Sequence, residues 1–346
     1  MEKKLDPENM FKAIWEFPEN LINALELGNS IKLKNNYNNI NNIVIAGMGG
    51  SAIGGDVLSV LEANNLNIPL VVCRGYSLPK WVDNSTLVIC SSYSGNTEET
   101  LAALDDAIRK KAQICGITTG GLIGEKIKEL GYDLVMIPSG LQPRAALAFS
   151  FVPMTKLIEK IGLINPGINI WLHDTAEKLK KKRELYSIEE TQNSVYSLAK
   201  KIYKKIPILY ADNSTLSVVA LRMKGQICEN AKMLAYHNDL PELNHNEIVG
   251  WENNSEITKD FFVLWLKDDQ DNNRVKLRQE ITSTILSEKK IDQAIISIEG
   301  DTFEYRFLNM INYGDWLSYW CAILHNTDPS PVVKIARLKN ELSAKS

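Results

Sequence analysis

The chain has 346 residues, enough for two α/β domains, because single hydrophobic cores rarely grow beyond about 250–300 residues. Hydrophobic residues make up 45% of the chain, charged residues make up 23%, and the formal net charge is -3. This balance is typical of a globular protein, and it argues against a nucleic-acid or membrane-surface partner.

The cysteines and the N-terminus indicate the cellular compartment. The five cysteines are scattered without CxxC spacing, so neither a disulfide framework nor a zinc site is expected. The N-terminus is polar, and no stretch approaches the roughly 18 continuous apolar residues of a membrane span. We therefore expect a cytoplasmic protein that does not engage a membrane.

Short apolar runs bounded by turn residues alternate with helix-like stretches in the first half of the chain. Such runs are typical of buried parallel strands, and the order β-α-β-β-α-β-α-β predicts a three-layer sandwich. A helical segment over 7–27 precedes them. The expected strands cover 43–46, 69–73, 86–90, 113–117 and 133–137, and the expected helices cover 52–63, 98–111 and 122–130.

The second half repeats this theme after a long helix expected over 174–204. It predicts strands at 207–211, 261–266 and 294–298, helices at 215–231 and 273–288, and two C-terminal helices. The predicted fold class is therefore α/β, with two three-layer α/β/α sandwiches on mainly parallel sheets. The predicted domains are 1–153 and 154–346.

The first candidate binding loop directly follows the first expected strand and opens a helix. It contains Gly47, Gly49, Gly50 and Ser51. Glycine permits positive φ and a close approach of backbone to an anion, while the free N–H groups and dipole of a helix start favour phosphate. Ser51 adds a hydroxyl. The alternative is a tight turn where the helix packs on the strand.

The same loop also fits a loose dinucleotide-binding pattern through Gly47-x-Gly49-x-x-Ala52. That use needs an acidic residue at the end of the second strand to hold a ribose, but Arg74 stands there. NAD is therefore disfavoured, and only NADP stays open on this pattern.

The second candidate loop, 91–97, follows the third expected strand and leads into a helix. Ser92, Ser94 and Thr97 gather hydroxyls where helix-start amides point outward, which makes a neutral set of donors for a phosphate dianion. A helix cap alone would explain Thr97 but not the serines. Both loops follow carboxyl ends of parallel strands, so we expect them to converge on one ligand.

Four segments together resemble a known family. The turn Gly49-Gly50-Ser51 and the segment 92–100 resemble the sugar isomerase (SIS) domain. The segments Gln142-Pro-Arg144 and Asn244-His245-Asn-Glu are similar to those of the bifunctional phosphoglucose/phosphomannose isomerases. The likeness covers nearly the whole chain.

This resemblance implies two SIS domains, with the phosphate-binding loops in the first. It also implies that glucose 6-phosphate and mannose 6-phosphate are interconverted with fructose 6-phosphate through a cis-enediol. The expected phosphate-binding residues are Gly49, Gly50, Ser51, Ser92, Ser94 and Thr97. A homodimer with active sites at the subunit interface is implied, with no metal or redox cofactor.

The family pattern also implies catalytic roles. Glu229 matches the base that moves a proton between C1 and C2, and His245 matches the residue that helps to open the sugar ring, reaching in from the partner subunit. Arg144 matches the cation beside the enediolate. Lys339 matches a lysine near the ring oxygen, with Lys334 as the alternative.

The chain departs from the family pattern at two places. Ser330 stands where threonine is expected, and Ala148-Phe149 replaces a glycine and an aromatic residue after Arg144. Neither change removes an assigned catalytic group, and Ser330 bears on the handling of the mannose epimer.

The chemistry can be assembled without a metal. Isomerisation needs a ring-opening group, a base and positive charge near the enediolate oxygens. His245 shares an expected polar loop with His237 and Glu247, but their irregular spacing lacks the fixed geometry of helical metal-ligand pairs.

Two other functions are compatible with the loops. A non-catalytic sugar-phosphate regulator on the same fold is disfavoured because no basic helix-turn-helix is found at either end. An amino-sugar transferase is disfavoured because no glutaminase domain with an N-terminal cysteine nucleophile is found.

Overall fold

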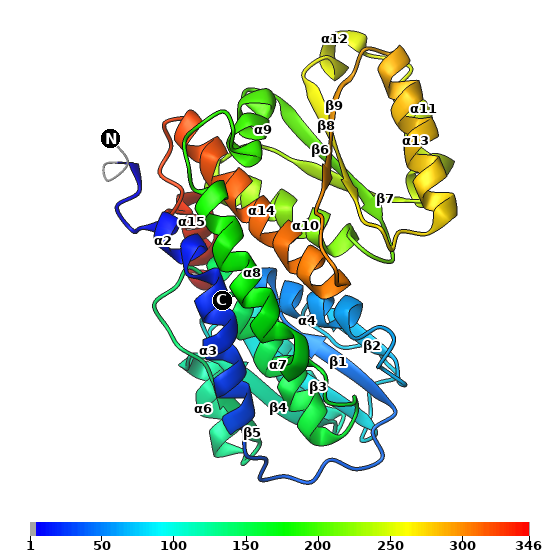
Figure 1. Cartoon of the computed structure of the whole chain (residues 1–346). Helices are drawn as coiled ribbons and strands as arrows, with labels where there is room; N and C mark the ends of the chain where they lie inside the picture. Colours follow the sequence, from blue (N-terminus) through cyan, green and yellow to red (C-terminus); the bar gives the residue numbers. More distant parts are fainter. Residues whose placement is uncertain (1–4, 346) are drawn as a thin grey trace. The chain divides into compact units, whose positions relative to one another are not determined.

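The computed structural model describes residues 5–345, which form two compact units (Figure 1). The first unit is residues 16–180, and the second combines residues 5–15 with 181–345. Among the described residues, no helix is both long and apolar enough to cross a membrane.

The first unit is built on a five-stranded parallel sheet in the order β2-β1-β3-β4-β5. The strands are β1 (Asn42–Ala46), β2 (Leu70–Cys73), β3 (Thr86–Ser92), β4 (Gln113–Thr118) and β5 (Asp133–Met136). The strand order reverses between β1 and β3. Such a switch point leaves a crevice at the carboxyl ends of the two strands, where ligands bind in doubly wound sheets.

Helices cover both faces of this sheet. Those that pack on it or on one another are α3 (Phe17–Ser30), α4 (Gly49–Leu61), α5 (Glu98–Arg109), α6 (Gly121–Glu129) and α7 (Leu147–Ile161). The helices α5 and α6 lie on one face, and α4 packs against α7 on the other. The first unit is therefore a three-layer sandwich.

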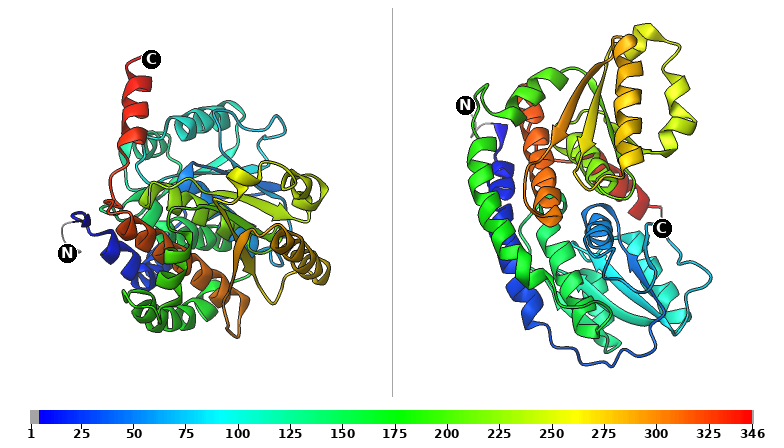
Figure 2. Two further views of the ribbon diagram at one scale, coloured as in Figure 1. Left: turned by 90° about the horizontal axis from the view of Figure 1, so that it is seen from above. Right: turned by 45° about the vertical axis from the view of Figure 1, so that its right-hand side comes forward.

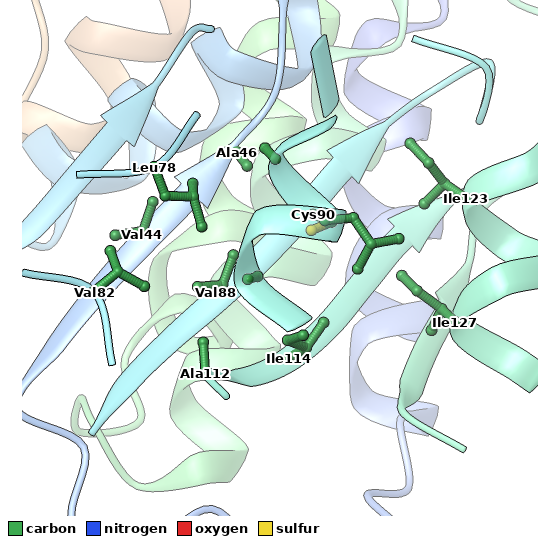
Figure 3. Close-up of a cluster of buried hydrophobic side chains, with 13 residues drawn as sticks. Val44, Ala46, Leu78, Val82, Val88, Cys90, Ala112, Ile114, Ile123 and Ile127 are labelled. Atoms are coloured by element: carbon green, nitrogen blue, oxygen red, sulfur yellow. The ribbon is translucent and has the colours of Figure 1, made fainter. Parts of the chain in front are cut away.

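The apolar core beneath α5 and α6 follows the two-residue period of the strands (Figure 3). Val44 and Ala46 of β1 and Val88 and Cys90 of β3 point into it. Full burial of each of the two valines contributes about 1.5–3 kcal/mol. This packing fixes the two strands whose ends carry the candidate loops.

The second unit is built on a four-stranded parallel sheet in the order β7-β6-β8-β9. The strands are β6 (Ile206–Asp212), β7 (Tyr236–Leu240), β8 (Phe261–Lys267) and β9 (Asp292–Ser297). The helices are α2 (Met10–Trp15), α9 (Ser194–Ile202), α10 (Ser217–Asn230), α11 (Glu247–Gly250), α12 (Ser255–Thr258), α13 (Asn273–Glu288), α14 (Phe303–Leu324) and α15 (Val333–Ser343). In Figure 2, α13 lies on one face of this sheet and α14 on the other.

The helix α14 is buried along almost its whole length and organises the second unit. It packs against α9, α10 and α2. The ring of Phe11 meets Trp316 and Tyr319 edge-to-face at centroid distances of 5.0 and 5.6 Å. This aromatic packing holds residues 5–15 in the second unit.

The predicted fold class is confirmed, since both sheets are parallel and both units are α/β. The expected strands agree with the structure to within two residues at each end. The compact units, however, divide the chain at 15/16 and 180/181, whereas the predicted division was at 153/154. The difference arises because α7 packs on α3 and α4, and because α2 packs on α14.

Two local predictions were wrong. The helix expected over 174–204 is two helices, α8 (Ile168–Tyr186) and α9. Asn193 ends the interruption, since its Oδ1 accepts the N–H of Val195 at 2.9 Å and its Nδ2 donates to the carbonyl of Tyr186 at 2.7 Å. The expected polar loop around His237 contains the edge strand β7, whose polar side chains hid the strand pattern.

Candidate active site

The loop after β1 places the start of α4 against Arg144. Gly49 has a φ of +50°, in the left-handed region that favours glycine. A Cβ on Gly50 would lie 2.7 Å from the carbonyl oxygen of Pro143, so only glycine fits this contact. The short helix η1 (Pro143–Ala145) carries Arg144, which is buried. The fold thus brings Arg144 beside the first candidate loop.

All three predicted hydroxyls of the loop after β3 take part in hydrogen bonds within that loop. Ser92 is only 1% exposed, and its Oγ accepts the N–H of Gly95 at 3.1 Å. The hydroxyl oxygens of Ser92 and Thr97 are 2.9 Å apart. Ser94 is exposed. Gly95 has a φ of +71°, and a Cβ there would overlap the carbonyl oxygen of Gly120, so this tight turn requires glycine.

The two candidate loops are in direct contact. The backbone N–H of Tyr93 donates to Ser51 Oγ at 3.1 Å. Because β1 and β3 are neighbours at the switch point, this contact places Ser51 and the serine loop at one sheet edge. Among residues 5–345, the Thr97 side chain makes no capping bond to α5. Its hydroxyl is therefore not used by the helix that it precedes.

A third loop, which was not among the predictions from the sequence, supports the site. Thr119 follows β4 and donates its N–H and its hydroxyl to the carbonyl of Tyr93, at 3.2 and 2.8 Å. Asn96 Oδ1 accepts the N–H of Leu122 at 3.0 Å. The segment 118–121 is polar, contains two glycines and follows an expected strand. This pattern of hydroxyls and glycines after a strand is the same signal that predicts the other two loops.

Arg74 is the residue that kept NADP binding possible on the sequence pattern, but in the structure it forms an ion pair within the first unit. Its guanidinium forms an ion pair with Asp56 of α4. Burial raises the pKa of the Asp56 carboxyl, and the positive charge of Arg74 partly opposes that rise. The pair joins the end of β2 to α4, so Arg74 has a role in the fold.

Glu229 lies in the last turn of α10, in the second unit, and is partly buried. Lys232 follows with a φ of +54°, and its Nζ donates to the carbonyl oxygen of Glu229 at 2.8 Å. The same ammonium group donates to the carbonyls of Asp328 and Pro329 at 2.8 and 3.0 Å. Lys232 thus ties the end of α10 to the segment that leads into α15.

His245 is the last residue of the short helix η2 (Glu242–His245), and it is exposed. Glu247 is bonded to the hydroxyl of Tyr210 and to Nδ2 of Asn238. His237 lies on β7, where burial lowers its pKa. In the part of the chain that the structure describes, no cluster of three or more His, Cys, Asp or Glu could hold a metal ion.

The two candidate lysines, Lys334 and Lys339, are both exposed on α15. Five residues of helix separate them by about 140° around the axis, so they point to different sides. Ser330 is buried, and its N–H donates to Asp328 Oδ1 at 2.9 Å.

The carboxyl edge of the second sheet is acidic. Asp268 forms a buried double contact with Arg306 at 2.7 and 2.9 Å. Asp212 and Asp271 lie at the same edge and are buried. The positive charge of Arg306 neutralises Asp268, but the two further carboxyl groups disfavour a phosphate dianion at this edge. The two sheets therefore differ in the ligand that their edges suit.

The predicted site residues therefore fall into two sets. Arg144 and the phosphate-binding candidates of both loops belong to residues 16–180, and the structure brings the two loops and the backbone at Arg144 together. Glu229, His245 and Lys339 belong to the second unit.

Two units built on parallel sheets, the first with glycine and serine loops at its switch point, define a protein with tandem sugar isomerase (SIS) domains. Residues 191–342 match the family model of the bacterial phospho-glucose isomerase C-terminal SIS domain. A solved structure of a hypothetical protein from Thermus thermophilus has a TM-score of 0.74 at 15% identity. The match covers 99% of this chain and 92% of that chain, and it concerns the fold alone.

Curated relatives identify the family. The bifunctional phosphoglucose/phosphomannose isomerase of Caldicellulosiruptor bescii is 44% identical over 96% of this chain and 99% of its own length. The enzyme of the same name from Aquifex aeolicus is 38% identical, over 87% and 90%. The chain belongs to the bifunctional phosphoglucose/phosphomannose isomerase family and is a sugar-phosphate isomerase.

Proposed function

We propose that the enzyme interconverts glucose 6-phosphate and mannose 6-phosphate with fructose 6-phosphate. The observation that carries the phosphate site is the bond between Tyr93 N–H and Ser51 Oγ, which joins two helix-start loops at the switch point. Helix N-termini and nearby hydroxyls favour a phosphate dianion without a lysine. Family membership supports the hexose skeleton.

In this proposal the phosphate binds on the glycines and hydroxyls of the two loops, namely Gly49, Gly50, Ser51, Ser94 and Thr97, with Ser92 behind Thr97. Ser94 is exposed, and within the described residues the Thr97 side chain makes no capping bond to α5, so both hydroxyls can donate to the phosphate. A hydrogen bond to a charged acceptor contributes about 1.5–3 kcal/mol. The loops therefore supply affinity and fix the sugar carbon chain relative to the catalytic groups.

Ring opening and proton transfer follow. His245 moves the proton that opens the hemiacetal, and Lys339 lies by the ring oxygen. Glu229 removes the C2 proton of the aldose and returns it to C1, through a cis-enediol. Arg144 stabilises the negative charge that develops on the enediolate oxygens. General base catalysis of this kind accelerates a reaction by about 10²–10⁴.

We also propose a cytoplasmic homodimer in which His245 is supplied by the second copy of the chain. The exposed position of His245 on η2 supports this arrangement, since its ring is accessible to another molecule. The mechanism assigns each step to a side chain, so it needs neither a metal ion nor a redox cofactor.

A coupled assay tests the function. Fructose 6-phosphate formation would be measured separately from glucose 6-phosphate and from mannose 6-phosphate, with and without EDTA. We expect turnover of both aldoses, unaffected by the chelator. Turnover of neither aldose would contradict the proposal, and turnover of one alone would restrict it to a single epimer. A protein that binds both sugars without turnover would be the regulator.

A further inference from the structure

Tyr93 lies at the centre of four loops at the carboxyl edge of the first sheet. Its N–H donates to Ser51 after β1, and its carbonyl accepts from Thr119 after β4. Its phenol oxygen accepts the N–H of Leu141, after β5, at 3.0 Å. With its own loop after β3, Tyr93 connects the ends of four strands.

These contacts differ in what a substitution would remove. The bonds to Ser51 and Thr119 use the Tyr93 backbone, and any residue except proline could make them at this position. The bond to Leu141 uses the phenol oxygen alone. Burial raises the pKa of the Tyr93 phenol, so it remains protonated at neutral pH. Replacing Tyr93 with Phe therefore deletes one link and leaves the phosphate loops in place.

Leu141, whose N–H donates to the Tyr93 phenol, lies three residues before Arg144 in the sequence. The segment 138–140 is exposed, and Gly140 has a φ of +104°. After Leu141, the N–H of Ala145 donates to the carbonyl of Gln142 at 2.8 Å, and Pro143 packs against Gly50. The backbone around Arg144 is thus held on one side by the phenol and on the other by α4.

We propose that Tyr93 is a positioning residue for Arg144, which it holds at a fixed place relative to the phosphate loops. The inference rests on the proposed function, in which Arg144 stabilises the enediolate. Phosphate is bound in ground and transition states alike, whereas the enediolate charge develops only during the reaction. Loss of the phenol contact therefore affects kcat rather than KM.

Tyr93→Phe tests this role. We expect kcat to fall about tenfold, the effect of losing roughly one hydrogen bond of transition-state positioning. The KM for fructose 6-phosphate and the inhibition constant of inorganic phosphate should change less than about twofold, because the loop backbone is kept. Hydrogen exchange in a peptide that contains Leu141 should become faster.

Tyr37→Phe is the matched control. The Tyr37 phenol contacts Asp133 Oδ2 at 2.9 Å and the carbonyl of Ile114 at 3.3 Å, at the opposite end of β4 and β5. The Tyr37→Phe variant removes the same phenol oxygen from the same unit. We expect kcat and the hydrogen exchange of the Leu141 peptide to stay at wild-type values. A similar loss of kcat in this variant would overturn the specific role of Tyr93.

An Arg144→Lys background shows whether Tyr93 acts through Arg144. We expect Tyr93→Phe to have little further effect on kcat in this background. Equal effects in both backgrounds, or an unchanged kcat in the single variant, would overturn the inference. If wild type turned over no hexose 6-phosphate, the proposed function would fail instead. Faster Leu141 exchange in Tyr93→Phe would then still report the contact independently.

Discussion

The hydroxyl oxygens of Ser92 and Thr97 lie 2.9 Å apart at the start of α5. Ser92 is buried at 1% exposure and already accepts the N–H of Gly95, so it is poorly placed to touch a ligand itself. We infer that its O–H donates to Thr97, which leaves the Thr97 O–H to donate outward. Ser92 would then act on phosphate through Thr97.

A double-mutant cycle tests this relay. Thr97→Ala should raise the KM for fructose 6-phosphate severalfold, since a hydrogen bond to a charged acceptor is lost. Ser92→Ala should raise it less, and the double variant should resemble Thr97→Ala alone. The fold should survive, because the Gly95 N–H also contacts the carbonyl oxygen of Ser92 at 3.2 Å.

Ser94→Ala serves as the control in the same cycle. Ser94 is exposed and stands apart from the Ser92–Thr97 contact, so its effect on KM should add to that of Thr97→Ala. Additive effects of Ser92→Ala and Thr97→Ala would instead mean that both hydroxyls touch the phosphate directly.

Lys232→Met should lower kcat without changing the affinity for inorganic phosphate. The ammonium group joins the carbonyl of Glu229 to those of Asp328 and Pro329, and this link holds the end of the helix that carries the proposed base. We expect a loss of roughly threefold to tenfold in kcat, the effect of losing about one hydrogen bond that positions the base. Steady-state kinetics with phosphate as inhibitor would measure both quantities.

Lys259→Met provides the comparison for Lys232. Lys259 pairs with Glu256 on the exposed helix α12, and surface pairs of this kind contribute little. Its removal should leave kcat unchanged. Wild-type kcat in Lys232→Met would show that the carbonyl contacts do not support the base.

Hybrid dimers should recover activity if His245 completes the site of the second copy. Glu229→Gln and His245→Ala proteins are each expected to be nearly inactive. After subunit exchange, about a quarter of the sites, half of those in each hybrid dimer, should contain both intact residues. Exchange would be verified with two affinity tags. No recovery after complete exchange would mean that each chain uses its own His245.

The sequence predicted the first unit well because its chemistry is local. The buried runs at 43–46 and 86–90 are apolar on both faces, and the glycine and serine loops follow them directly. These patterns need no knowledge of distant residues. The carboxyl-edge position of both loops follows from parallel pairing, and the Tyr93–Ser51 contact agrees with it.

Other features depend on contacts between distant residues. The Tyr93 phenol meets Leu141 across 48 positions, and Lys232 meets Asp328 across 96, so neither contact has a signature in a short window. The strand β7 is an edge strand with polar side chains, which resembles a loop in sequence. The break between α8 and α9 depends on the hydrogen bonds of the Asn193 side-chain amide to the backbone of Tyr186 and Val195.

Solvent deuterium incorporation tests the central claim, that Glu229 shuttles a proton between C2 and C1. Fructose 6-phosphate would be incubated in D₂O with wild type or Glu229→Gln and followed by NMR. Wild type should place deuterium at C1 of the ketose and C2 of the aldoses, because the carboxyl proton exchanges with solvent. Glu229→Gln should bind inorganic phosphate normally but lose turnover and exchange by about 10²–10⁴. Near-normal exchange in this variant would contradict the mechanism.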